Sequence, residues 1–394
     1  MSQKSLSLQF LADLTEFNRP DRVLQLPTYE LETESRVVCG STKSFKDVCD
    51  KLAQTPDWGH NLLKVQKCWQ DFGCQGNGVT VAVLDTGVDS GHPDLKVSTG
   101  KDFTGSPYGW ADAQGHGTHC AGIIAAKNNT LGVVGVAPNA TLIAGKVLSD
   151  SGSGTIEGIA SGIDWAVTSG AHVISMSLGG DGPISGILRT AIDRAIAAGV
   201  IVVVAAGNSG PYPDTVGSPG NYTPCVTVAA VDSSSRVASF SSRGPQLDVA
   251  APGVQIMSTY PGGQYTALSG TSMATPYVAG IAALFVEYAK RLNVKPTQKL
   301  FESYVTATSL DLGQPGHDID YGFGLIQPSN LLQKLKNDFS APVPPPTPTP
   351  TPPPTPPTPI PGPDPVKAMS LKLTLLDKSS MVIKNVTGVT VAPQ

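Results

Sequence analysis

The chain has 394 residues, which is room for one large domain or two ordinary ones, and 40% of them are hydrophobic, which is enough for a sizeable core. Only 15% of the residues are charged, the formal net charge is -4, and there is no block of basic residues. This composition argues against nucleic acid or an anionic membrane as a partner, and no stretch is long and apolar enough to span a bilayer.

Four parts follow one another along the chain. Residues 1–52 are polar and weakly patterned, whereas residues 53–337 hold nearly all the strong apolar runs. Residues 341–365 contain 15 prolines, which predicts an extended polyproline spacer of roughly 75 Å. Residues 366–394 form a short tail of alternating apolar and polar side chains, which predicts two or three strands, too few for an independent core.

Strands and helices alternate through residues 53–337. Buried strands are predicted at 79–84, 140–147, 172–177, 200–205 and 226–231. Helices are predicted at 117–126, 154–168, 186–198 and 272–292. Apolar strands that alternate with helices are typical of a three-layer α/β/α fold, in which helices cover both faces of a mostly parallel sheet.

The six cysteines include no C-x-x-C pair, so a zinc site is a weak interpretation. Four of them lie between residues 39 and 74. This clustering suggests a disulfide-stapled N-terminal segment, with Cys39 paired to Cys49 and Cys68 paired to Cys74. The spacing does not fix the connectivity, and the alternative is that all six thiols are reduced.

Two segments place a carboxylate and an imidazole at the ends of predicted elements. Asp85 ends the first apolar strand, in VAVLDTGVDSGHPDL, where α/β sheets place their active sites. A turn-capping aspartate is the alternative. His116 lies between two glycines before a helix, in GHGTHCAGIIAA. It suits a general base, a structural histidine, or a metal ligand shared with His119.

A third segment, SGTSMATPYVAGIAALF, places Ser272 at the start of a long buried helix. Such a serine commonly serves as a helix cap, but free N–H groups and the helix dipole at this position also stabilise an oxyanion. A serine hydroxyl needs a base to become a nucleophile, and a carboxylate orients that base. Asp85, His116 and Ser272 follow in the chain order of subtilisin, which differs from the order in chymotrypsin or the α/β-hydrolases.

In these three segments the chain resembles the subtilisin family of serine proteases, over about residues 53–337. The resemblance implies hydrolysis of protein and peptide substrates through an acyl-enzyme, by a monomer. VVVAAGNSG, residues 202–210, is similar to the family's oxyanion segment and implies Asn208 as the side-chain donor. Two alternatives are a processing protease of narrow specificity and an inactive binding scaffold with a protease fold.

The family binds its substrate as an extended strand between two enzyme strands. The resemblance implies that residues 148–154 and 177–179 are these edges, and that residues 205–207 and 216–217 line the pocket for the P1 side chain. Small uncharged residues there imply a preference for large apolar P1 residues. The residues expected to bind substrate are Leu148, Gly152, Gly154, Ile156, Ser177, Leu178, Gly179, Ala205, Gly207 and Gly217.

AKNNTLGVVGVAP, residues 126–138, resembles the family's calcium loop, although an asparagine-rich turn is the alternative. Calcium prefers six to eight hard oxygen ligands, many of them backbone carbonyls. The ion would be structural. The resemblance implies as ligands the side chains of Gln54, Asp94 and Asn129 and the carbonyls of Lys127, Leu131 and Val133.

Cys120 occupies the position of the cysteine in the family's thiol-dependent branch, which implies inhibition by mercurials; a buried structural thiol is the alternative. The family's members are usually secreted zymogens. Residues 1–52 are short for the usual prosegment, so they are expected to be a reduced propeptide, an inhibitory extension or a permanent part of the enzyme. The resemblance therefore implies secretion. Because residues 1–14 lack a clear secretory signal, an intracellular location is the alternative.

Overall fold

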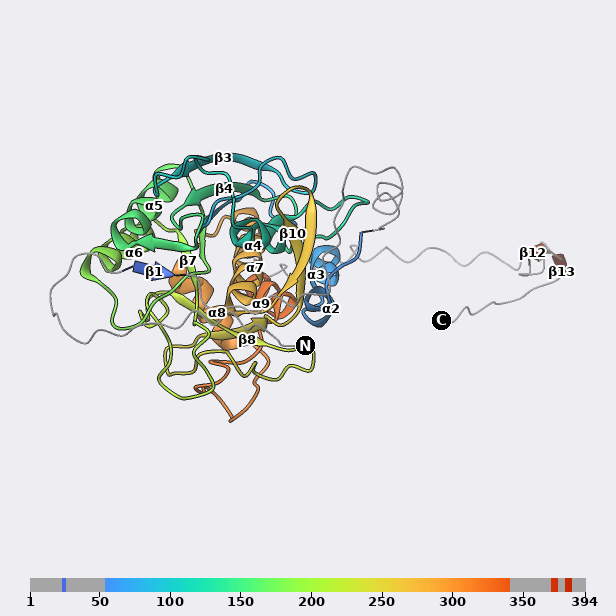
Figure 1. Cartoon of the computed structure of the whole chain (residues 1–394). Helices are drawn as coiled ribbons and strands as arrows, with labels where there is room; N and C mark the ends of the chain where they lie inside the picture. The colour runs from blue at the N-terminus through green and yellow to red at the C-terminus, as the bar shows by residue number, and fades with distance from the viewer. Residues whose placement is uncertain (1–22, 26–53, 341–369, 375–379, 385–394) are drawn as a thin grey trace, which may run out of the picture. The chain divides into compact units, whose positions relative to one another are not determined.

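The computed structural model describes residues 23–25, 54–340, 370–374 and 380–384. The large unit is built on a seven-stranded sheet with the order β3-β4-β2-β6-β7-β8-β9, in which every adjacent pair is parallel (Figure 1). Its strands are β2 (Thr80–Asp85), β3 (Val97–Asp102), β4 (Thr141–Lys146), β6 (Val173–Met176), β7 (Ile201–Ala205), β8 (Val226–Val231) and β9 (Val249–Pro252).

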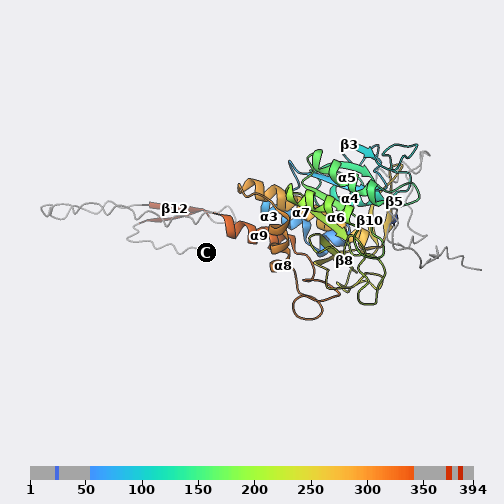
Figure 2. The same ribbon diagram turned by 90° about the vertical axis from the view of Figure 1, so that its left-hand side faces the viewer.

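Helices pack on both faces of this sheet (Figures 1 and 2). One face is covered by α5 (Ile156–Thr168) and α6 (Gly186–Ala197). The other is covered by α4 (His116–Ala125) and α7 (Thr271–Arg291), and the same apolar cluster includes residues of α3 (Val65–Phe72), α8 (Gln298–Thr308) and α9 (Pro328–Phe339). The short helix α2 (Trp58–Leu62) precedes α3.

Strand β2 shows how the sequence specifies three layers. Val81 and Val83 point into the cluster around α4 and α7, whereas Ala82 and Leu84 point into the cluster around α5 and α6. Successive side chains of a strand face opposite sides, so a continuous apolar run is buried on both faces of a parallel sheet. The predicted three-layer α/β/α fold is therefore confirmed, and the predicted strands and helices overlap the observed ones.

Three antiparallel pairs lie outside the main sheet. β10 (Ile256–Tyr260) and β11 (Gln264–Leu268) form a hairpin. β1 (Val23–Gln25) pairs with β5 (Ser153–Thr155), which directly precedes α5. Residues 341–394 form a second unit, in which β12 (Ser370–Thr374) pairs with β13 (Ser380–Lys384) where alternation predicts strands. The predicted proline spacer lies outside the described residues.

The predicted pairing of Cys68 with Cys74 is wrong. Both are free thiols with no exposed surface. Cys68 faces the apolar cluster from α3, whereas Cys74 follows the left-handed Gly73 that ends the helix, and its Sγ lies 3.5 Å from the Phe72 carbonyl. Burial raises the pKa of each thiol to about 12. The two cysteines therefore act as small apolar side chains, and Cys39 and Cys49 lie outside the described residues.

Among the described helices, none combines the length and hydropathy that crossing a membrane requires.

Candidate active site

The four predicted catalytic residues lie where the strands of the main sheet end. Asp85 is the last residue of β2, and His116 is the first residue of α4. Asn208 follows β7, and Ser272 is the second residue of α7. Because β2, β6 and β7 are neighbours in a parallel sheet, their carboxyl ends meet at one edge, which is where α/β folds bind ligands.

Asp85 and His116 form a buried ion pair or hydrogen bond, depending on the protonation of the imidazole. Asp85 Oδ1 lies 2.8 Å from His116 Nδ1, and each residue is 1% exposed. Burial favours the neutral imidazole, but the interactions with the Asp85 carboxylate and the Cys120 side chain together outweigh it, and the pKa of His116 is raised well above the ordinary value of 6.5. The contact also fixes a proton on Nδ1, which leaves Nε2 of the neutral ring to act as a base.

Asp112, which the sequence analysis did not single out, connects the two halves of this pair. Its buried carboxylate accepts hydrogen bonds from the Thr86 hydroxyl at 2.9 Å, from Gly115 N at 2.8 Å and from Thr118 N at 2.8 Å. Thr86 follows Asp85, and the other donors flank His116. Asp112 thus holds the turn after β2 against the start of α4. It lies in an irregular loop, so neither periodicity nor a motif indicates it.

Ser272 is held through its carbonyl oxygen. Pro276 lies four residues later inside α7 and has no N–H to donate to that carbonyl, as a regular helix would require. The Ser177 hydroxyl donates to it at 2.9 Å instead, and Cys120 Sγ lies 3.4 Å away. Cys120 Sγ is also 3.9 Å from His116 Nδ1. One buried thiol therefore contacts both the Ser272 carbonyl and the His116 ring, while the Ser272 hydroxyl lies 3.5 Å from the Ser177 carbonyl.

Two N–H donors border one small space beside Ser272. Asn208 Oδ1 accepts hydrogen bonds from Thr271 N at 3.0 Å and from the Thr271 hydroxyl at 2.9 Å, which fixes the orientation of its amide. A Cβ added at Gly270 would lie 3.1 Å from Asn208 Nδ2 and 3.6 Å from Ser272 N. A glycine at this position therefore keeps side-chain atoms away from both donors, and an oxyanion hole needs such accessible N–H groups.

The predicted substrate-binding residues lie along the same edge of the sheet. Leu148, Gly152 and Gly154 lie between β4 and the start of α5, where β5 is paired with β1. The P1-pocket segments are also joined, because Gly217 N donates to the Ala206 carbonyl at 3.1 Å. Ile156, Ser177, Leu178 and Ala205 are buried, and Gly179 and Gly207 follow β6 and β7.

Most of the predicted calcium ligands lie close together, whereas no contact of the Leu131 carbonyl with the others is observed among the described residues. Gln54 Nε2 donates to the carbonyls of Lys127 at 2.6 Å and Val133 at 3.0 Å, and it lies 3.5 Å from Asn129 Oδ1. The fully buried Asp94 carboxylate accepts from Asn129 Nδ2 at 2.8 Å, and Leu131 N donates to Asn129 Oδ1. Burial raises the pKa of Asp94, so a nearby cation would favour its charged form.

His119 does not join His116 at a shared metal. Its Nε2 lies 3.0 Å from the carbonyls of both Ile256 and Thr266, which makes it a structural link between α4 and the hairpin of β10 and β11. Burial lowers its pKa to about 3, so the ring is neutral. Burial also raises the pKa of Cys120, and inhibition by mercurials through that thiol stays a prediction.

Comparison with known proteins gives consistent matches over this unit. Residues 76–324 match the model of the subtilase family. The chain is 48% identical to subtilisin DY of Bacillus licheniformis over 276 residues, which are 70% of this chain and 97% of that protein. It is 46% identical to subtilisin E of Bacillus subtilis over 284 residues, 71% of this chain and 72% of that protein. It is 44% identical to a thermostable alkaline protease of Halalkalibacterium halodurans over 282 residues, which are 72% of this chain and 75% of that protein.

The geometry predicts the direction in which the pKa of His116 changes when its partner is neutralised. In Asp85→Asn the carboxylate that raises this pKa is lost and burial remains, so we expect the pKa to fall below that of the native protein. NMR titration of the histidine ring protons measures it. His172, which contacts Thr80 and Lys290, is an internal control. An unchanged His116 titration would contradict the account.

Proposed function

The chain belongs to the subtilase family and is a serine endopeptidase that acts on peptides or proteins, and we propose that Asp85, His116 and Ser272 are its catalytic triad with Asn208 in the oxyanion hole. The observation that carries this assignment is the buried 2.8 Å contact between Asp85 and His116, with the Cys120 thiol in contact with both the His116 ring and the Ser272 carbonyl.

In the proposed mechanism the Ser272 hydroxyl attacks the carbonyl carbon of the scissile bond while His116 Nε2 takes its proton. Asp85 stabilises the imidazolium that forms. The negative oxygen of the tetrahedral intermediate accepts hydrogen bonds from Asn208 Nδ2 and Ser272 N. His116 then gives its proton to the leaving amine, and a water molecule, activated by the same imidazole, hydrolyses the acyl-enzyme.

Substitutions of the nucleophile and of the oxyanion donor test this assignment. We expect Ser272→Ala to abolish casein hydrolysis and labelling by a sulfonyl fluoride. We expect Asn208→Ala to lower kcat by about 10²–10³-fold, the range known for the equivalent change in another subtilisin. The matched control is Asn139→Ala, whose exposed amide contacts Gln75. Casein hydrolysis that survives Ser272→Ala would rule out the triad, and an inactive native protein would favour the scaffold.

We further propose broad specificity with a preference for large apolar P1 residues. The segments at 205–207 and 217 are small and uncharged, and the positive φ of Gly207 is one that other residues rarely adopt. Peptide anilides that differ only at P1 measure this preference. Faster cleavage after Arg or Glu than after Phe or Leu would contradict it, and cleavage of a single partner protein but not of casein would favour the processing protease.

Residues 1–52 are proposed to be a propeptide or inhibitory extension of the catalytic domain at 53–337. The backbone of β1 supports this, since Leu24 pairs with Gly154 on the edge that is expected to bind substrate. A segment there competes with substrate for the same backbone groups. N-terminal sequencing should find residues 1–52 retained in Ser272→Ala and removed from the active enzyme. Full activity toward peptides with the segment still attached would contradict an inhibitory role.

We also propose that the enzyme is secreted.

A structural calcium ion fits the cluster at Gln54 and Asp94. Several oxygens surround the Gln54 amide, and a half-turn of that amide would add its own Oε1 to them. The ligands would be Gln54, Asp94 and Asn129 through side chains and Lys127, Leu131 and Val133 through carbonyls. Such a hard-oxygen set with one buried carboxylate suits calcium. The ion would tie the loop at 127–133 to residue 54, far along the chain.

Removal of calcium is therefore expected to destabilise the protein. A ligand present at 100 times its Kd stabilises the folded state by about 2.7 kcal/mol, so chelation by EDTA should lower Tm, and added calcium should restore it. Calorimetry on Ser272→Ala measures this without autolysis. Asp94→Asn should remove the calcium response, while Asp71→Asn, on the exposed face of α3, should keep it. Identical melting curves with calcium and with EDTA would contradict the site.

A further inference from the structure

Lys146 is a buried lysine that the proposed chemistry does not use. It ends β4 beside Asp85, its partner in the parallel register, and its side chain has no exposed surface. Its ammonium donates to the carbonyl oxygen of Thr86 and pairs with Asp150 Oδ1 at 2.8 Å. Burying an ammonium is unfavourable unless its charge is compensated, and the Asp150 carboxylate is the acidic group that pairs with it.

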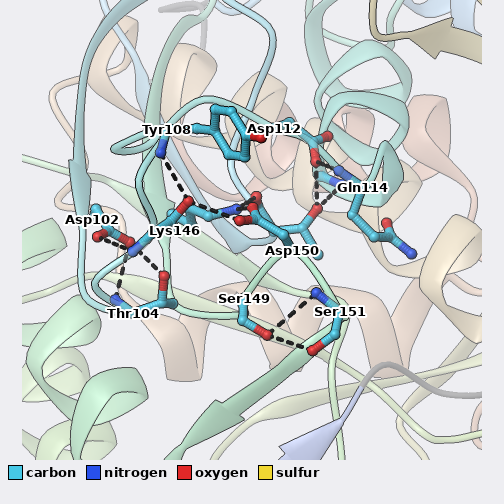
Figure 3. A network of polar contacts seen from close by, with 12 residues as sticks. Asp102, Thr104, Tyr108, Asp112, Gln114, Lys146, Ser149, Asp150 and Ser151 are labelled. Carbon is cyan, nitrogen blue, oxygen red and sulfur yellow. Dashed lines mark hydrogen bonds and ion pairs between the residues drawn. The ribbon is translucent and has the colours of Figure 1, made fainter.

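Asp150 also contacts a second loop of the enzyme. Its other carboxylate oxygen accepts a hydrogen bond from the Ser106 hydroxyl at 2.9 Å. Asp102 fixes that loop, because its carboxylate accepts hydrogen bonds from Thr104 N and Ser106 N at 3.0 Å each (Figure 3). Asp150, at 32% side-chain exposure, therefore lies between the buried end of β4 and the loop that follows β3.

The turn that contains Asp150 leads into β5. Ser149 N donates to the Ser153 carbonyl at 2.7 Å, and the hydroxyls of Ser149, Ser151 and Ser153 contact one another. These contacts stay within the turn. Before the turn, the N–H groups of Val147 and Leu148 donate to the Asp85 carbonyl. Asp150 is thus the side chain that joins the turn itself to the rest of the catalytic unit, among the contacts of the described residues.

We propose that Lys146 and Asp150 are positioning residues, which hold the substrate-binding edge at 149–155 at a fixed distance from the turn that carries Asp85. The inference rests on the proposed function, because it takes β5 to be the edge that pairs with the substrate. Lys146 contacts Thr86, the neighbour of the triad aspartate, and Asp150 lies in the turn that sets the course of β5. One ion pair therefore couples the place where a peptide is bound to the place where it is cut.

Peptides of different length separate this role from general damage. A peptide that occupies P4 to P1 pairs with β5, whereas a single-residue ester with the same P1 side chain reaches only the P1 pocket and the triad. Displacement of β5 should therefore weaken binding of the P4–P1 peptide, which is measured as a higher KM. Turnover of the single-residue ester should stay nearly unchanged. A pair that merely stabilised the fold would change both substrates equally or neither.

The test compares Asp150→Asn with the native enzyme on a tetrapeptide anilide and a single-residue ester, below the melting transition of both proteins. Asparagine keeps an oxygen for Lys146 and removes the charge. We expect KM for the tetrapeptide to rise about tenfold, and kcat/KM for the ester to change less than twofold, as a small misplacement of one binding edge would cause. Asp150→Ala, which removes both contacts, should enlarge the same split.

Asp71→Asn is the matched control, because Lys67 and Asp71 form an exposed pair with the same spacing at 2.7 Å, and neither constant should change. An equal loss of kcat/KM on the two substrates would overturn the positioning role. The same holds if neither Asp150 variant loses activity on either substrate. In either case the native enzyme still cleaves both substrates, so the proposed function stands. A native enzyme that cleaves neither substrate would instead refute the proposed function, and this inference with it.

Discussion

The contact between the Asp85 carboxylate and the His116 imidazole is the constraint around which the site is built. Both groups are almost completely buried, and burial alone would favour the uncharged form of the His116 imidazole. Together they favour the charged imidazolium, which is the species that the proposed reaction must stabilise. The arrangement works only if β2 and α4 are held in register, and the Thr86 hydroxyl and the Asp112 carboxylate provide that connection.

The start of α7 is shaped by a missing hydrogen bond. Pro276 leaves the Ser272 carbonyl without its usual partner in the helix, and Ser177, after the neighbouring strand β6, supplies one. Ser272, the proposed nucleophile, is thereby attached to the sheet that also carries Asp85. Gly270 leaves open the space that Asn208 and Ser272 N border. A helix start, a proline, a glycine and the Ser177 hydroxyl thus fix the position of Ser272.

Most of the fold and the four proposed catalytic residues could be predicted from the sequence, because apolar runs such as 79–84 and the motifs around Asp85, His116 and Ser272 are local patterns. Asp112, Lys146 and Asp150 could not be predicted in the same way. Their importance comes from contacts between segments, such as Asp112 with Thr86, that no spacing reveals. The error at Cys68 and Cys74 has the same origin, since closeness in sequence does not show whether two thiols face each other or the core.

In the proposed mechanism His116 activates Ser272 because Asp85 orients and charges the imidazole. The most direct measurement is the rate of Ser272 sulfonylation by phenylmethanesulfonyl fluoride as a function of pH, with the modified residue identified by mass spectrometry. The account predicts that the label is on Ser272 and that the rate rises as His116 loses its proton, with a midpoint above 6.5 that moves to lower pH in Asp85→Asn. A label on another residue, or a midpoint that Asp85→Asn leaves in place, would contradict it.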